Sequence, residues 1–469
     1  MSQDEIANMT AIELLRHYHD GTLSPVEAAE AALTRIDAHD ETVNAFCHVD
    51  PDTTLAFARA SEERYRRHNP CGLLDGVPVG VKDVFLTREW PTRKGSRTVD
   101  PAVAPDEDAP VVSALKRNGY VPVGKTTTPE FGWKGVTDNP IDGITRNAWN
   151  PDRTAGGSSG GSASSVALGM GPLALGTDAG GSIRIPAGFS GIVGHKPTQG
   201  RVPFWPPSPF GNLAHPGPMS WTVEDAALMM DVLTESDPRD ATLPPPEGSY
   251  LEALTGRVDD LRIAYSPTLG YVDVDPEIRA SLDRAVETLI DLGAQVDRVD
   301  PGFEDPRTSF DRLFYGGAAN AMRDLGPDKR ALMDPNLVKV CEWAEGLSGL
   351  DYMAALNEQR ILTEQMGRFH NRYDLLLTPS LPIPAFTAGL EVPEGADDPR
   401  WPGWTRFTYP FNMTGQPACS VPCGFTGDGL PIGLQLVGGR HMDALVLRAA
   451  HAYQLAAPLT HIRPALLAD

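Results

Sequence analysis

Short apolar runs alternate with longer amphipathic stretches along most of the chain. The apolar runs, which are typical of buried strands, cover 77–81, 120–125, 173–177, 261–266, 295–299, 375–378, 420–425 and 433–437. The amphipathic stretches, which place apolar residues at helical spacing, cover 111–118, 222–233, 276–292 and 442–455. Strands that alternate with helices in this way predict an α/β fold built in layers.

Capping patterns predict two helices near the start of the chain. Thr10 and Glu13 form a capping box, and Gly21 stands where the left-handed C-terminal cap of a helix belongs. The residues Ser24-Pro25-Val26-Glu27 repeat the pattern, with proline at the first helical position.

Two segments rich in proline interrupt the alternation of strands and helices. Leu243–Gly256 contains three consecutive prolines and is interpreted as a linker or a long surface loop. Pro203–Pro218 combines prolines with aromatic residues, which suits either a rigid loop over a pocket or a loop packed on the surface.

The charge balance restricts the partners of the protein. The 469 residues include 62 acidic and 40 basic side chains, for a formal net charge of −22. This balance disfavours nucleic acids and anionic membranes, since both attract cationic patches. Neither a signal peptide nor a transmembrane segment is evident, and the five scattered cysteines indicate free thiols in a reducing, cytoplasmic location. Their spacing indicates no metal site.

The segment Thr154–Ala187 holds two serines, Ser158 and Ser182, each next to a pair of glycines. A flexible linker is disfavoured because alanines and aliphatic residues suited to a packed helix follow directly. A phosphate-binding loop would need a lysine, and none is present. The spacing of Gly169, Gly171 and Ala174 imitates a dinucleotide-binding fingerprint, but Pro172 and the lack of a preceding strand weaken that interpretation.

Ser158 also matches the nucleophile elbow of α/β-hydrolases, because Gly156-Gly157-Ser158-Ser159-Gly160 has the form G-x-S-x-G. A Ser–His–Asp esterase would then need a later histidine, and six are available: His195, His215, His370, His441, His451 and His461. The elbow serine should follow a strand directly, whereas the residues before this cluster read as a loop. This argues against the esterase, but the available histidines keep it as an alternative.

Ser182 and Lys82 supply a second route to an activated serine. Gly180-Gly181 before Ser182 can turn consecutive N–H groups toward one point, as in an oxyanion hole, although a plain glycine turn would look the same. Lys82 ends the apolar run Val77–Val81, so its stem should leave the core. A buried lysine has a lowered pKa, and a neutral lysine can take the proton of a serine.

Taken together, these features resemble the amidase signature family. The resemblance covers roughly Ser24 to Leu455 and includes the blocks GVPVGVKD, VPVGKTTTPEFG, TRNAWNPDRTAGGSSGGSAS, TDAGGSIRIPA, GHKPTQGRVP, PFNMTGQPACSVPCGF and GLPIGLQLVG. It implies a single α/β/α unit around a large mixed sheet over residues 66–469, with a helical segment over 1–65 packed on it. No metal or cofactor is implied, and a homodimer is compatible with the family.

The resemblance also implies the roles of individual residues. Ser182 would be the nucleophile, and Ser158, on a cis peptide bond, would connect it to Lys82. The oxyanion hole would be formed by the N–H groups of Ala179, Gly180, Gly181 and Ser182. Ser159, Asp178 and Arg184 would support the site.

The family contains several kinds of enzyme. We expect an amidase for small-molecule amides, with carbamates or esters as side substrates. The alternative is the glutamine-hydrolysing component of a tRNA-dependent amidotransferase, which is ranked second because Thr128–Gly132 reads more like the stand-alone amidases. A scaffold that only binds is disfavoured because all three catalytic residues are present. An apolar pocket that suits aryl or medium-chain amides could be formed by Phe131, Trp133, Phe204, Trp205, Phe210 and Tyr315, which could equally be core residues.

Overall fold

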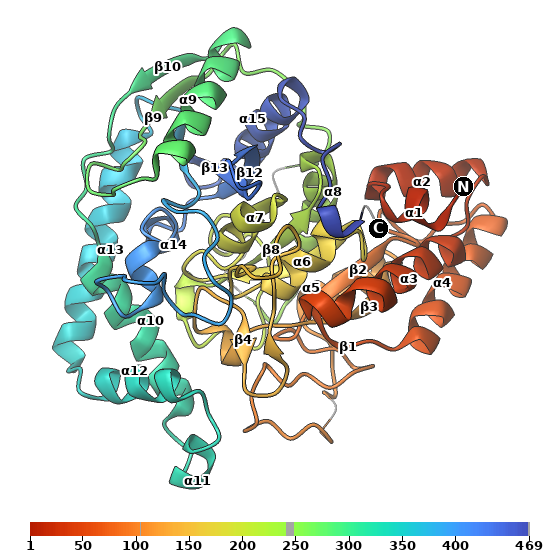
Figure 1. Cartoon of the computed structure of the whole chain (residues 1–469), viewed down its shortest axis with the longest axis horizontal. Helices are drawn as coiled ribbons and strands as arrows, with labels where there is room; N and C mark the ends of the chain where they lie inside the picture. Colours follow the sequence, from red (N-terminus) through yellow and green to blue (C-terminus); the bar gives the residue numbers. More distant parts are fainter. Residues whose placement is uncertain (104, 241–247, 468–469) are drawn as a thin grey trace.

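The structure of the protein is a computed structural model that describes residues 1–103, 105–240 and 248–467. Its centre is a mixed sheet of eleven strands in that part of the chain (Figure 1). In spatial order the strands are β1 (Phe46–His48), β3 (Val121–Thr126), β2 (Pro78–Lys82), β6 (Leu173–Asp178), β8 (His215–Ser220), β7 (Val193–Lys196), β12 (Ala418–Phe425), β13 (Pro431–Gly438), β11 (Leu375–Pro379), β9 (Arg262–Tyr265) and β10 (Gln295–Arg298).

The sheet is parallel near both ends and antiparallel in the middle. Strand β2 pairs in parallel with β3 and β6, and β9 pairs in parallel with β10 and β11. Between β6 and β11 the strands run in the order β6, β8, β7, β12, β13, β11, and each adjacent pair in this series is antiparallel. A small hairpin, β4 (Asp138–Asn139) with β5 (Gly143–Ile144), lies outside this sheet.

Helices cover both faces of the sheet, and the alternation of strand residues shows how. Leu173, Leu175, Leu375 and Leu377 belong to the core beneath one layer of helices, which contains α5 (Pro110–Arg117), α8 (Val223–Leu233), α9 (Pro276–Asp291) and α15 (Asp443–Ala456). The residue between each pair points to the other face. Ala174 packs in the core of α6 (Gly160–Ala167) and α7 (Arg184–Ser190). The predicted layered α/β fold is therefore confirmed.

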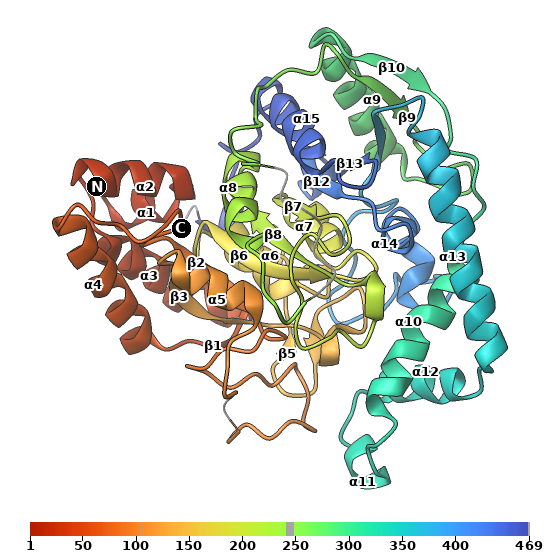
Figure 2. The ribbon, with the colours of Figure 1, turned by 180° about the vertical axis from the view of Figure 1, so that it is seen from behind.

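Two further groups of helices lie at opposite ends of the molecule (Figures 1 and 2). The first group, at the N-terminal end, contains α1 (Gln3–Ala7), α2 (Ala11–Asp20), α3 (Pro25–Val43) and α4 (Pro51–Arg66). The second contains α10 (Arg307–Met322), α11 (Pro327–Arg330), α12 (Pro335–Glu345), α13 (Gly349–Phe369) and, toward the centre, α14 (Pro410–Met413). Side chains of α10, α12 and α13 share the second large hydrophobic core with Leu376 and Val437 of the sheet.

The predicted helix caps are present. Thr10 and Ser24 both form complete capping boxes, and Gly21 has a left-handed φ of 67°. The N-terminal helices are tied to the sheet through β1, which pairs with β3. The division into residues 1–65 and 66–469 stays a prediction.

One of the two proline-rich segments differs in part from its predicted form. Residues 243–247 of Leu243–Gly256 lie outside the described residues, and 248–256 form turns and irregular structure without a helix or strand, as expected for a linker or loop. The loop that begins at Pro203 ends at Ala214, because β8 already starts at His215. The prediction of irregular structure up to Pro218 was therefore wrong over its last four residues.

Candidate active site

Lys82 ends strand β2 and is fully buried. Its Nζ makes three hydrogen bonds, at 2.7 Å to Ser158 Oγ, 2.8 Å to Ser159 Oγ and 2.8 Å to Thr177 Oγ1. Burial places the pKa of this amine well below its usual value, although the charge of Asp178 opposes the shift. The side chain is therefore a buried amine that meets hydroxyl groups on three sides.

Ser158 lies in the loop that leads into α6, and the peptide bond between Gly157 and Ser158 is cis. A Cβ at Gly157 would lie 2.5 Å from the backbone of Val136, so only glycine fits there. The next residue, Ser159, connects this loop to the segment that contains Thr177 and Ser182. Its backbone N–H donates to the carbonyl of Ser182 at 3.2 Å, and its hydroxyl donates to the carbonyl of Thr177.

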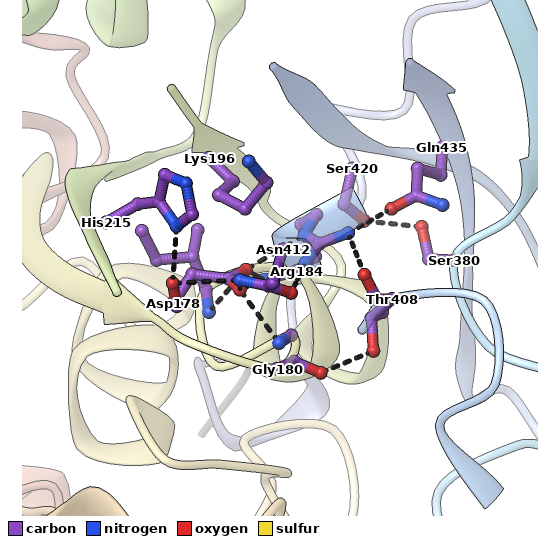
Figure 3. Close-up of polar contacts among 12 residues, drawn as sticks. Asp178, Gly180, Arg184, Lys196, His215, Ser380, Thr408, Asn412, Ser420 and Gln435 are labelled. Carbon is purple, nitrogen blue, oxygen red and sulfur yellow. Dashed lines mark hydrogen bonds and ion pairs between the residues drawn. The ribbon is translucent and has the colours of Figure 1, made fainter. Parts of the chain in front are cut away.

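Ser182 lies between β6 and α7, in a loop whose shape is set by a buried ion pair (Figure 3). The Asp178 carboxylate accepts from Arg184 Nε at 2.8 Å and from Arg184 Nη2 at 3.0 Å, and both side chains are fully buried. Burial alone would raise the pKa of Asp178, but Arg184 and Asn412 hold it well below its usual range. The guanidinium also reaches Thr408, Asn412 and Gln435, so it joins this loop to the C-terminal part of the sheet.

The same network holds the two glycines before Ser182. The Gly180 carbonyl accepts from the Thr408 hydroxyl at 2.7 Å, and the Gly181 N–H donates to Asp178 Oδ1 at 2.8 Å. The Gly181 N–H therefore already has an acceptor, which argues against its predicted place in the oxyanion hole. For the backbone N–H groups of Ala179, Gly180 and Ser182 the structure records no acceptor within the described chain.

A cavity of about 590 Å³ opens beside these groups. Ser158, Thr177, Ala179 and Ser182 all line it, so the two predicted serines share one cavity. Most of the remaining wall is apolar and includes Val84, Val99, Phe131, Phe204, Phe210, Met322 and Leu325. Residues 206–210 of the predicted proline-rich loop line it too, which favours the interpretation of a loop over a pocket.

Three of the six aromatic residues predicted for the pocket do not line this cavity. Trp133 and Tyr315 are buried in the hydrophobic core that contains α10. The guanidinium carbon of Arg239 lies over the Trp205 ring, 5.1 Å from the centre of that ring. Phe131, Phe204 and Phe210 are the predicted aromatic residues that the structure brings to the cavity.

The six histidines considered for a Ser–His–Asp triad do not line the cavity either. His215 Nδ1 lies 3.0 Å from the Asp178 carbonyl, and burial lowers the pKa of His215 to about 3. His195 contacts Asp443 and His370 contacts Tyr373 and Gln416. The contacts of Ser158 are with Lys82, which disfavours the esterase alternative.

Neither a metal site nor a membrane span is found in the part of the chain that the structure describes. No group of three histidine, cysteine, aspartate or glutamate side chains among them is arranged to hold a metal ion. No helix in the same part of the chain has the length and apolar character needed to cross a membrane.

Comparison with known proteins decides the family. The Amidase family model matches residues 27–447. The chain belongs to the amidase family. Among its relatives, an acylamidase of Rhodococcus erythropolis is 36% identical over 473 residues, which cover 99% of each chain.

Two other similarities bear on this amidase. The A-type subunit of the glutamyl-tRNA(Gln) amidotransferase of Chloroflexus aggregans is 37% identical over 92% of this chain and 93% of its own. The crystal structure of a bacterial aryl acylamidase matches with a TM-score of 0.89 and 30% identity, covering 97% of both chains. The amidase is thus a hydrolase that acts on C–N bonds, with the fold of the amidase signature enzymes.

Sequence reasoning missed two polar residues at the site. Thr177 directly precedes Asp178 in TDAGGS and supplies the third hydroxyl at Lys82. Asn412, in PFNMTG, donates to both the carboxylate and the carbonyl of Asp178. Both lie in blocks that carry the family resemblance, but nothing in the local pattern indicates that they would meet Lys82 or Asp178.

Proposed function

We propose that Ser182 is the nucleophile of this amidase, that Ser158 relays its proton, and that Lys82 is the general base. The observation that supports this assignment is the 2.7 Å contact between Lys82 Nζ and Ser158 Oγ, beside a cavity that Ser158 and Ser182 share. A serine hydroxyl is a weak nucleophile until a base takes its proton, and a desolvated lysine can act as that base.

The hydrogen bonds around Lys82 are compatible with a neutral amine whose lone pair faces Ser158. A neutral amine has two N–H groups and one lone pair, so one of its three hydroxyl neighbours must donate to it. Ser159 already donates its proton to the Thr177 carbonyl and therefore accepts from Lys82. If Thr177 Oγ1 accepts the other N–H, the lone pair meets the Ser158 hydroxyl, as a proton relay requires.

The reaction would then proceed through an acyl-enzyme on Ser182. Lys82 takes the Ser158 proton while Ser158 takes the Ser182 proton, and Ser182 Oγ bonds to the amide carbon. The oxyanion is stabilised by the N–H groups of Ala179, Gly180 and Ser182. The C–N bond breaks as the relay returns a proton to the leaving nitrogen, and water hydrolyses the acyl-enzyme by the same relay in reverse.

Ser182 must turn toward Ser158 for the first step. Among the described residues the Ser182 hydroxyl has no hydrogen-bond partner, so its contact with Ser158 has still to form. Catalytic hydrogen bonds often close only when substrate is bound.

The cavity wall supports amides with an apolar acyl or amine part. Phe131, Phe204 and Phe210 provide aromatic surface, and the volume lies within the range of pockets for drug-sized ligands. We propose aryl or medium-chain amides as substrates, with carbamates and esters as side substrates because their acyl carbons react alike.

Covalent labelling tests the assignment. A fluorophosphonate probe should add one phosphonyl group to Ser182, as located by peptide mass spectrometry, and 4-nitroanilides should be hydrolysed. Ser182→Ala should lose both, whereas Ser158→Ala should still label slowly. His451→Gln is the matched control, since His451 lies outside the cavity. An adduct on Ser158 would favour the esterase, and an unlabelled folded protein would favour a scaffold that only binds.

Glutamine hydrolysis within a tRNA-dependent amidotransferase is the second candidate function, because the relative from Chloroflexus aggregans is as similar to this chain as the acylamidase is. That function predicts glutamine hydrolysis that rises on addition of the partner proteins. Hydrolysis of anilides without any partner, with no turnover of glutamine, would exclude it.

We also propose that this amidase is cytoplasmic, with a homodimer as a possible form of assembly. The five cysteines are free, and Cys341, Cys419 and Cys423 are buried, which supports a reducing cytoplasmic compartment. Sedimentation of the purified protein would decide between a monomer and the homodimer.

A further inference from the structure

Two residues that line the catalytic cavity have an unusual backbone conformation. Lys94 has a φ of 55° and Phe131 a φ of 53°, in the left-handed region that side chains other than glycine rarely adopt. The two are joined directly, since the Phe131 N–H donates to the Lys94 carbonyl at 2.8 Å. Such conformations persist where the surrounding structure enforces them, and they concentrate at functional sites.

A glycine that is itself left-handed follows each of the two residues. Lys94 is followed by Gly95 and Phe131 by Gly132, with φ of 62° and 73°. A Cβ at Gly95 would lie 2.7 Å from the Thr128 carbonyl, and one at Gly132 would lie 3.2 Å from Ser158 Oγ. Two bonded, left-handed turns therefore present Lys94 and Phe131 at the cavity beside the catalytic serine.

Lys94 is the one charged residue among the described residues that line the cavity. The structure records no hydrogen bond or ion pair of its ammonium group with any described residue. The opposite charge that acts on it is that of Asp83, whose carboxylate forms its ion pair with Lys125, at 3.5 Å. A half-buried cation thus borders an apolar cavity without a partner of its own.

Burial makes the charge of Lys94 costly. Desolvation lowers the pKa of Lys94, and the attraction of Asp83 only partly offsets it. An anionic group bound in the cavity would offset the desolvation of Lys94, because an opposite charge within a few ångströms stabilises the ammonium. The hydrogen bond of a carboxylate to an ammonium is also stronger than one between neutral groups.

From these observations we infer that Lys94 is a specificity-determining residue, and that the substrate is an amide whose apolar body carries a carboxylate. The carboxylate pairs with Lys94 while the aromatic wall holds the apolar body. This inference rests on the proposed function, since it places the scissile bond at Ser182. It narrows the substrate class to amides of dicarboxylic acids or of amino-carboxylic acids.

Matched substrates test the inference. The 4-nitroanilides of adipic and suberic acid carry a free carboxylate on the acyl side, and those of hexanoic and octanoic acid are their neutral partners. N-hexanoyl-4-aminobenzoate and N-hexanoylaniline form the corresponding pair on the amine side. The wild-type enzyme should favour the carboxylate member of at least one pair by about tenfold in kcat/KM.

Three variants of lysine residues make the result specific to Lys94. Lys94→Met should remove the preference for the carboxylate, and Lys94→Arg should keep most of it, because arginine retains the charge. Lys339→Met, at an exposed lysine of α12, is the matched control and should leave the preference unchanged. Melting temperatures show whether each variant is folded.

A binding measurement separates this inference from the proposed function. Calorimetry with the Ser182→Ala protein, which does not depend on turnover, should show that the carboxylate member of at least one of the two matched pairs binds about tenfold tighter than its neutral partner. The added Lys94→Met substitution should abolish the difference. Equal binding of the two members in both pairs would overturn the role of Lys94 even if Ser182 is acylated. Failure to label Ser182 would instead overturn the proposed function.

Discussion

Lys82 Nζ lies 2.7 Å from Ser158 Oγ, and neither group is more than slightly exposed to solvent. The contact joins the end of β2 to the loop before α6, which are separated by 76 residues in sequence. An amine at this position can act as a base only if it is neutral. The first prediction follows from that requirement.

The activity should depend on pH through Lys82. Burial lowers the pKa of this amine, and only the neutral form accepts a proton, so kcat/KM should rise with pH through that pKa and then level off. Lys82→Met should lower kcat/KM by about 10²- to 10⁴-fold and remove this acid limb. A pH profile with a 4-nitroanilide measures both. An unchanged acid limb in the variant would assign the titration to another group.

The free energy of unfolding should also rise with pH, as kcat/KM does. Below pH 10.5 the unfolded chain keeps Lys82 protonated, whereas the folded chain disfavours the proton. The free energy of unfolding should therefore rise with pH between the folded and unfolded pKa values, by up to about 1.4 kcal/mol per pH unit. Urea unfolding of the wild type and Lys82→Met at several pH values should show this slope as the difference between them.

Thr177 is predicted to be a positioning residue for Lys82. Thr177→Val removes one hydrogen-bond acceptor of the amine, which disfavours the ammonium form and lets the side chain rotate. We expect kcat/KM to fall about tenfold, the value of one hydrogen bond, and the acid limb to move to lower pH. Thr363→Val is the control, because its hydroxyl only bonds a carbonyl within α13. A loss of activity with a fixed acid limb would indicate a structural role alone.

The loop that carries Ser182 should tolerate no side chain at Gly181. Its φ is 128°, and a Cβ there would collide with the Thr408 hydroxyl, which is itself held by the Gly180 carbonyl. Gly181→Ala should abolish labelling of Ser182 and lower the melting temperature. Gly302→Ala is the matched control, since Gly302 has a φ of 83° and open space around it, and should cost only about 1–2 kcal/mol. Equal effects of the two changes would show that φ alone matters.

The sequence was sufficient for most of the sheet but not for β1, β7 and β8, and β8 is the most instructive of the three. Val77–Val81 and Leu173–Thr177 are continuous apolar runs because β2 and β6 are buried on both faces. Strand β8 contains Pro216 and Pro218, which normally exclude a central strand. The prolines are tolerated because β7 pairs only with Met219 and Ser220, so that both prolines have β6 as their single neighbour.

Ser158, Ser182 and Lys82, the proposed catalytic residues, could be named from sequence because glycine clusters and a strand end are local signals. The state of the Gly181 N–H could not, since its acceptor Asp178 is found only once the loop has folded back on itself. Trp133 and Tyr315 were misplaced for a related reason. An aromatic residue near a site in sequence has the same pattern whether it faces the cavity or the core.

The last prediction concerns the buried pair of Asp178 and Arg184, which shapes the Ser182 loop (Figure 3). Arg184→Met leaves a fully buried carboxylate without its partner and should lower the free energy of unfolding by about 3–5 kcal/mol. The pKa of Asp178 is lowered in the fold, so its contribution is present above the unfolded pKa and is lost as pH falls. The deficit of the variant should therefore be largest above about pH 4 and shrink on acidification.

Adding Asp178→Asn to Arg184→Met should recover part of the lost free energy of unfolding. Arg368→Met, which breaks an exposed pair with Glu364, should cost less than about 1 kcal/mol in the same urea titration. If the two arginine variants were equally stable, the buried pair would not be what holds the loop.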